Sequence, residues 1–135
     1  MVALLGTAAV VYTVRSPLFL IRNLDIVQVP DFAPLDVETI RRLVSIPVGQ
    51  INLFDVSLKE IERRVHASPW VRGVRLTKRF PQTLEVGVIF REPRALLVTD
   101  NGSLAYLDST GEAFGQLDLS VQPDLPVMSG FKVSD

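Results

Sequence analysis

The stretch that decides the fold is residues 57–93, which reads SLKEIERRVHASPWVRGVRLTKRFPQTLEVGVIFREP. Ser57 and Glu60, three positions apart at its start, form the pattern of a helix N-terminus in which side chains satisfy free backbone N–H groups. Pro69 ends that helix, because the residue before a proline is disfavoured in the α-helical region. The remainder predicts two strands that are separated at Pro81.

The second of these strands, residues 84–90, has the clearer pattern. Period-two alternation is typical of a sheet with one face on a core. Here Leu84, Val86, Val88 and Phe90 alternate with Glu85, Gly87, Ile89 and Arg91. The first strand, residues 70–77, is less regular because Arg72 interrupts its apolar positions. Between the sheet and a pair of helices we expect a core that includes Leu43, Ile61, Trp70, Val86 and Val88.

The chain upstream of this stretch supplies one more strand and one more helix. Residues 19–29 are rich in branched apolar residues and predict a strand. A helix follows, with Asp36 as its N-cap and Glu38 in the first turn, where the helix dipole favours an anion. Pro47 ends this helix. The order strand, helix, helix, strand, strand predicts an α+β layer whose helices pack on one face of the sheet.

Beyond Pro93 the pattern changes to short strands and turns. Asp100-Asn101-Gly102 is a strong hairpin signal, residues 108–111 form a second turn, and residues 122–130 are loop-like. The predicted strands are residues 95–99, 103–107 and 112–117. They are the beginning of an antiparallel meander, which needs further strands to cover its edges.

Residues 1–14 are uncharged and almost wholly apolar. A helix of this length spans roughly 21 Å, against about 30 Å of bilayer hydrocarbon, so the run is too short to cross alone. We interpret it as the outer part of a transmembrane helix. The alternatives are a cleaved signal peptide, which would need a basic n-region, and a buried core helix, which would have a polar face. Arg15 and Arg22 follow the run and, taken alone, would place that side in the cytoplasm.

The composition disfavours several classes of function. The chain has no cysteine, one histidine and a net charge of −1, so it has no thiolate chemistry and no global field that would draw it to nucleic acid. His66 is expected at a helix C-terminus rather than in catalysis. The turn at residues 108–112 lacks the alternating oxygen ligands of a calcium loop. We therefore expect a protein that is not an enzyme, with no catalytic, cofactor-binding or metal-binding residues and no cofactor.

The candidate binding site lies in the basic run of the strand that begins at residue 70, formed by Arg72, Arg75, Lys78 and Arg79. Arg72, Leu76 and Lys78 share one parity of that strand and mix charge with an apolar side chain, so they are the candidate partner-binding residues. The alternative is that Leu76 faces the core and the charges only guard a strand edge. A partner protein or lipid head groups are the ligands that such a strand could take.

Taken together, these motifs resemble those of the FtsQ/DivIB family of bacterial cell-division proteins. Each motif is short, and their order and spacing along nearly the whole chain carry the resemblance. In chain order the motifs are Phe19-Leu20-Ile21, residues 24–29, residues 49–53, Pro69-Trp70-Val71, Lys78-Arg79-Phe80-Pro81, residues 84–90, Arg91-Glu92-Pro93, Leu107-Asp108 with Gly111, and Leu125-Pro126 with Gly130.

The resemblance implies a POTRA-like β-α-α-β-β domain followed by a partial antiparallel β meander, with an N-terminal partial transmembrane helix. The corresponding parts are a partial transmembrane anchor at residues 1–17, a POTRA domain at residues 18–93 and a truncated β domain at residues 94–135. We expect a single-pass protein of the cytoplasmic (inner) membrane, with its folded part on the periplasmic or extracellular side at the division septum.

The function implied is that of a non-enzymatic divisome scaffold that links early and late division proteins. The resemblance also implicates the strand around Arg72 in recruitment. The implied partners are membrane proteins of the divisome such as FtsB and FtsL. In this family the late strands of the β domain hold FtsB, and the resemblance does not carry that site onto this chain. The alternative is a POTRA module of an outer-membrane protein assembly or secretion factor, which tandem POTRA copies or barrel strands would indicate.

Overall fold

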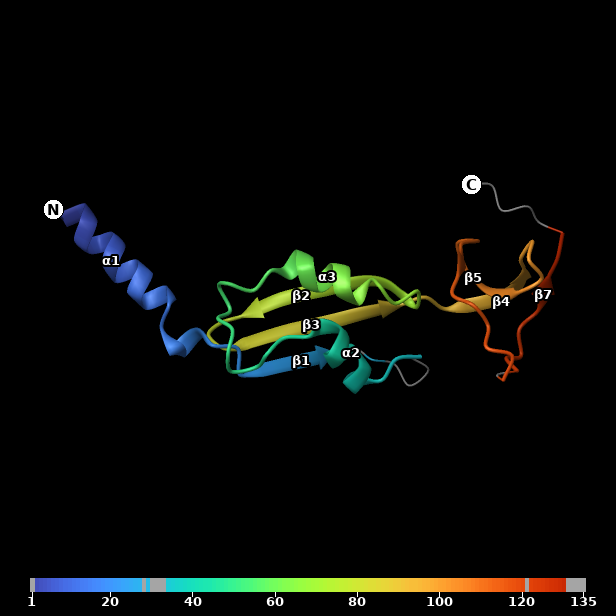
Figure 1. Cartoon of the computed structure of the whole chain (residues 1–135), viewed down its shortest axis with the longest axis horizontal. Coiled ribbons are helices and arrows are strands. Elements are labelled where there is room, and N and C mark those ends of the chain that lie inside the picture. The colour runs from blue at the N-terminus through green and yellow to red at the C-terminus, as the bar shows by residue number, and fades with distance from the viewer. Residues whose placement is uncertain (1, 28, 30–33, 121, 131–135) are drawn as a thin grey trace. The chain divides into compact units, whose positions relative to one another are not determined.

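The computed structural model describes residues 2–27, 29, 34–120 and 122–130. The chain divides into two compact units, Met1–Ile89 (unit 1) and Phe90–Asp135 (unit 2). Unit 1 combines helices with a three-stranded sheet, and unit 2 is built on a four-stranded sheet (Figure 1). The predicted mixed α+β class is therefore confirmed.

Unit 1 begins with helix α1, Val2–Val14, which leads to a short 3₁₀ helix, η1, Pro17–Phe19. The 13 residues of α1 include no charged one. Its large apolar side chains are exposed, as at Leu4 (77%) and Leu5 (70%). Among the residues that the structure describes, no helix combines the length and the apolar character needed to cross a membrane.

The two helices that cover the sheet of unit 1 are α2, Val37–Val44, and α3, Leu58–Val65. Both begin at the predicted caps. The Asp36 carboxylate accepts a hydrogen bond from the Thr39 N–H at 2.7 Å, and the Ser57 hydroxyl accepts one from the Glu60 N–H at 3.3 Å. These caps satisfy N–H groups that the first turn of a helix leaves free, so local sequence sets where each helix starts.

The three strands of the sheet are β1, Asn23–Val27, β2, Val71–Arg79, and β3, Thr83–Phe90. β3 lies in the middle, parallel to β1 and antiparallel to β2 (Figure 1). α2 packs against β1, and α3 packs against β2. β1 is shorter than the strand predicted at residues 19–29, because Pro17 starts η1 and Leu20 pairs instead with Asn52. Gln28, within that prediction, lies outside the described residues.

The core of unit 1 lies between the helices and the sheet. The prediction that Ile61, Val86 and Val88 are buried is confirmed. The prediction is wrong for Trp70 and Leu43, which are half-buried. β2 begins only at Val71, which is 3% exposed. Trp70 therefore lies in the turn before the strand, and Val71 takes the buried position. The side chains with no exposed surface are those of Ile21, Ile40, Val44, Leu53, Ile61, Val65, Leu84 and Val86.

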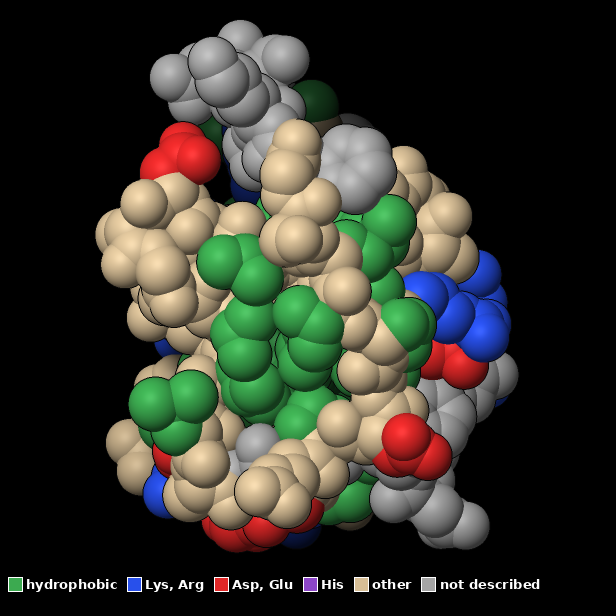
Figure 2. All heavy atoms as spheres, turned by 90° about the vertical axis from the view of Figure 1, so that its right-hand side faces the viewer, with side chains coloured by type: hydrophobic (Ala, Val, Ile, Leu, Met, Phe, Trp, Pro, Cys, Tyr) green, Lys and Arg blue, Asp and Glu red, His purple; other side chains and the backbone are tan. Residues whose placement is uncertain are grey.

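The strands of unit 2 are β4, Pro93–Val98, β5, Leu104–Asp108, β6, Ala113–Phe114, and β7, Val127–Met128, in the order β6-β5-β4-β7. The β4–β5 hairpin turns where the sequence predicts it, with Gly102 at φ 80°. β7 pairs in parallel with β4, within the stretch predicted to be a loop. Only two residues form it, so no local periodicity could reveal it. Apolar side chains gather on one face of unit 2 (Figure 2).

The carboxylate of Asp108 organises the turn between β5 and β6. Its Oδ1 accepts hydrogen bonds from the N–H groups of Thr110 (2.8 Å) and Glu112 (3.1 Å), and its Oδ2 accepts one from Arg91 Nη1 (2.9 Å). The hydrogen bond from the Thr110 hydroxyl is the largest of the causes that lower the pKa of Asp108 from 3.8 to about 2. The predicted turn is confirmed. Both carboxylate oxygens of Asp108 accept hydrogen bonds from protein groups.

Replacing Ile61 by alanine tests the core of unit 1. The side chain is fully buried on α3, and its removal leaves a cavity, so Ile61→Ala should lower the free energy of unfolding by about 2–5 kcal/mol. Lys59→Ala, at an exposed position of the same helix, should change it by less than about 0.5 kcal/mol. Urea unfolding followed by the fluorescence of Trp70, the single tryptophan, measures both. Equal effects would contradict the core assignment.

Asp108 should make the stability of unit 2 depend on acid pH. Because folding lowers its pKa from 3.8 to about 2, the ionised side chain stabilises the folded state above pH 3.8, and this contribution is lost as the pH falls toward 2. Asp108→Asn should weaken protection of the β4–β5 amides at neutral pH and flatten the pH dependence between about 4 and 2. Hydrogen exchange measured by mass spectrometry checks this, with the exposed Asp100→Asn as control. An unaltered pH profile in Asp108→Asn would show that another carboxylate is responsible.

Candidate partner-binding surface

Strand β2 lies at one side of the sheet of unit 1, in the part of the chain that the structure describes. An edge strand turns one row of backbone N–H and C=O groups away from its sheet, and these groups can pair with an added strand. β2 has nine residues, whereas β1 at the opposite side has five. β2 is therefore the longer of the two edges that unit 1 offers.

The three candidate residues share one face of β2. A side-chain carbon at Gly73 would meet Ile89 at 3.5 Å, and one at Gly87 would meet Arg75 at 3.7 Å. From Gly73 onward, the odd-numbered residues of β2 therefore lie with the odd-numbered residues of β3 on the open face of the sheet, whereas Val71 at the start of β2 is buried. The even-numbered residues, which include all three candidates, lie on the face that the helices cover.

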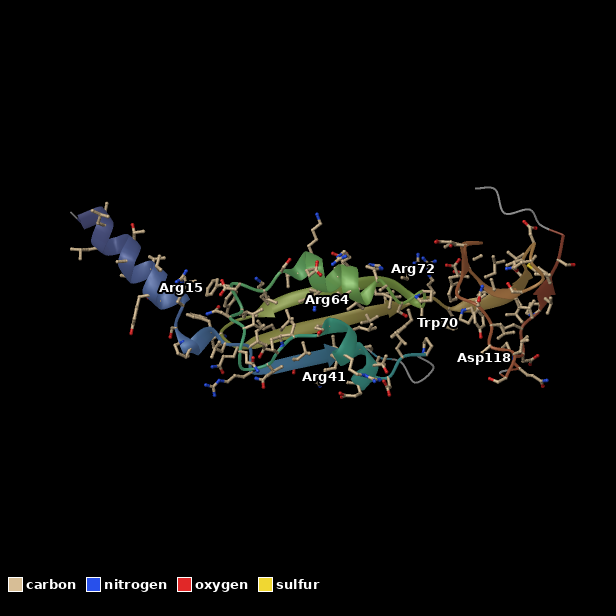
Figure 3. All side chains as sticks on the ribbon, in the orientation of Figure 1. Arg15, Arg41, Arg64, Trp70, Arg72 and Asp118 are labelled. Atoms are coloured by element: carbon tan, nitrogen blue, oxygen red, sulfur yellow. The ribbon has the colours of Figure 1, made fainter. Side chains whose placement is uncertain are left out.

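The three candidates differ in exposure. Arg72 is exposed, whereas Leu76 and Lys78 are half-buried. Arg72 lies close to the start of the strand (Figure 3). The structure thus places all three on one face of an edge strand, with an apolar side chain between two cations. A partner strand that carries acidic and apolar side chains would complement this arrangement.

The other two cations of β2 lie on the open face of the sheet. Arg79 forms an ion pair with Glu85 of β3. Arg75 packs beside Gly87, which is buried because Arg75 and Val27 flank it. The four cations of residues 72–79 are therefore divided between two faces of the sheet, and they do not form one patch.

His66 occupies the C-cap of α3, as expected. Its backbone N–H donates to the carbonyl oxygen of Glu62 at 2.9 Å, and its Nε2 lies 4.0 Å from the Glu62 carboxylate. Within the described ranges, no three side chains of His, Cys, Asp or Glu are placed so that they could hold a metal ion.

A second surface of unit 1 has no counterpart among the predicted residues. The rings of Phe19, Phe54 and Phe80 form a cluster, with centroid separations of 5.0 Å for Phe19–Phe54, 4.9 Å for Phe54–Phe80 and 6.3 Å for Phe19–Phe80. Phe54 is 42% exposed and Phe80 is 53% exposed. The three rings come from three separate turns of the chain, so no periodicity marks them. The one signal in the sequence is that Phe54 and Phe80 lie outside the predicted helices and strands.

Asn52 joins this phenylalanine cluster to the end of α1. Its Nδ2 donates to the carbonyl oxygen of Val14 at 2.9 Å, and its Oδ1 accepts from the N–H of Phe54 at 2.9 Å. The Leu53 N–H donates to the carbonyl oxygen of Phe19 at 2.8 Å. Asn52 is 9% exposed, so its bonds are largely shielded from water. One buried amide therefore hydrogen-bonds both the end of α1 and one residue of the cluster, Phe54.

The sheet and helices of unit 1 match a known family. Residues 22–89, just over half of the 135 residues, match the family model described as "POTRA domain, FtsQ-type". The matched span takes in β1, α2, α3, β2 and nearly all of β3. It therefore includes the β2 surface and two rings of the phenylalanine cluster.

Curated relatives agree with this match. Proteins named "Cell division protein FtsQ" are 33% identical over 79 residues in Syntrophotalea carbinolica (58% of this chain, 27% of the relative) and 32% identical over 125 residues in Myxococcus fulvus (93% and 42%). The one in Geotalea daltonii is 30% identical over 113 residues (84% and 40%). The chain thus spans less than half the length of these relatives. The resemblance indicated by the sequence motifs is confirmed, and the chain belongs to the FtsQ-type POTRA domain family.

Proposed function

We propose that this chain is the POTRA-bearing part of a bacterial cell-division protein that acts as a non-enzymatic scaffold at the septum. It links early and late division proteins by binding them. The observation that carries the proposal is an FtsQ-type POTRA unit whose longer edge is strand β2. The names of the relatives supply the context of cell division.

The mechanism of recruitment is strand addition at β2. A partner segment in extended conformation pairs with the outer backbone groups of the strand, and these hydrogen bonds supply affinity. Specificity comes from the side chains of Arg72, Leu76 and Lys78, which present a cation, an apolar group and a cation along the strand. Partner segments with acidic residues are favoured, because like charges opposite the cations would repel.

We assign a separate role to each of three consecutive segments of the chain. Residues 18–93 form the POTRA domain, residues 94–135 belong to a β domain, and residues 1–17 anchor the chain in the cytoplasmic membrane. The uncharged, exposed surface of α1 supports the anchoring role. The folded part then lies on the periplasmic or extracellular side, and its partners are divisome membrane proteins such as FtsB and FtsL.

Reversing the charge at Lys78 tests the recruitment surface. Lys78→Glu should impair septal localisation of the complete gene product in cells depleted of the native copy, because an added acidic strand would be repelled. Arg72→Glu should act in the same direction. Both variants should keep their stability within about 0.5 kcal/mol of the parent, as measured by urea unfolding, since neither side chain lies in the core.

The matched control is Lys59→Glu, which makes the same charge change at an exposed position of α3. It should leave localisation and division normal. Normal septal localisation in both strand variants would reduce β2 to a structural strand. A defect of equal size in the control would attribute the effect to net charge rather than to the strand.

A further inference from the structure

We propose that the phenylalanine cluster of Phe19, Phe54 and Phe80 is a lipid-contact surface that seats unit 1 on the interfacial region of a phospholipid bilayer. The inference rests on the proposed membrane attachment of α1 and goes beyond it. Attachment through α1 alone would leave the rest of unit 1 in water. The cluster adds a second contact, which fixes the orientation of the POTRA unit at the membrane surface.

The first support is the exposed apolar surface of the cluster. Phe54 is 42% exposed and Phe80 is 53% exposed, and Leu18, next to Phe19, is 56% exposed. Single apolar residues scattered over a protein surface are ordinary, but rings that touch one another at the surface are a mark of an interaction site. Phenylalanine and leucine are the side chains that interfacial segments insert at the boundary between head groups and acyl chains.

The second support is the connection to α1, and it selects lipid as the occupant. The described part of α1 is apolar all round, so a bilayer is the environment that can cover its whole circumference. Asn52 hydrogen-bonds both the last residue of α1, Val14, and the cluster residue Phe54. A bilayer that covers the last turn of α1 therefore reaches the cluster as well. Tyr12, 84% exposed in that turn, has the amphipathic ring typical of the membrane–water boundary.

The third support is the charge beside the cluster. Arg15 directly follows α1 and lies where the helix joins the rest of unit 1 (Figure 3). Arg22 comes three residues after Phe19, and both arginines are exposed. Asp55, exposed beside Phe54, offsets one of them. Arginine side chains at a membrane interface place their stems along apolar surface and their guanidinium groups in the polar head-group layer.

Relocating the tryptophan tests the proposal. Trp70 precedes β2 and Phe80 follows it, so the two positions lie about 30 Å apart along the strand. In a Trp70→Phe background, Phe80→Trp moves the single indole of the chain into the cluster. The complete chain is reconstituted in vesicles of phosphatidylcholine and phosphatidylglycerol that contain brominated lipids, which quench indole fluorescence on contact.

The expected result is position-dependent quenching. The indole introduced by Phe80→Trp should lose the larger part of its emission, more with bromine near the head groups than with bromine deep in the acyl chains, because interfacial side chains enter only about 5–10 Å. Trp70 in the parent chain should lose little. Substituting Phe54→Ser beside the introduced indole should reduce the quenching, whereas Val37→Ser, at an exposed apolar position on α2, should not. Circular dichroism confirms that each variant is folded.

A third indole separates this proposal from the attachment of α1. In the same Trp70→Phe background, Tyr12→Trp reports whether α1 enters the bilayer. Quenching of that indole without quenching at position 80 would leave the anchor in place and overturn the lipid contact. Quenching at neither position would overturn both the anchoring by α1 and the lipid contact of the cluster. A blue-shifted but unquenched indole at position 80 would show that protein, rather than lipid, covers the cluster.

Discussion

The fold of unit 1 depends on the burial of β3. Leu84 and Val86 have no exposed surface, and a slip of one residue would turn them to the open face, so the strand has one register that keeps the core. With β3 in the middle, β1 and β2 become the edges of the sheet. The partner surface proposed on β2 is therefore a consequence of where the core lies.

Much of this arrangement is predictable because its signals are local. The N-caps at Asp36 and Ser57, the alternation along β3 and the hairpin ending at Gly102 each lie within a few residues of the element they set. Alternation along a strand also places the candidate residues Arg72, Leu76 and Lys78 on one face of β2. The position of β2 at an edge of the sheet depends on the order of the strands. Periodicity does not give that order, and the family resemblance does.

Other features depend on contacts between distant parts of the chain. The ring cluster joins Phe19 to Phe54 and Phe80, and β7 is defined only by its pairing with β4. Which of the two parities of the basic run lies on the open face becomes visible only once the neighbours of Gly73 and Gly87 are known. Trp70 is half-buried rather than a core residue, because the strand begins only at Val71. None of these outcomes is encoded in a short window of sequence.

The parallel pairing of β1 with β3 has a mechanical consequence. α1 leads into the first residue of β1, and the last residue of β3 leads into unit 2. Tension applied between α1 and unit 2 therefore pulls two parallel strands in opposite directions along their length. The five register pairs from Asn23–Thr83 to Val27–Gly87 share that load and must yield together, whereas a hairpin opened from its end yields pair by pair. This topology makes the POTRA unit a stiff link that resists shear along its strands.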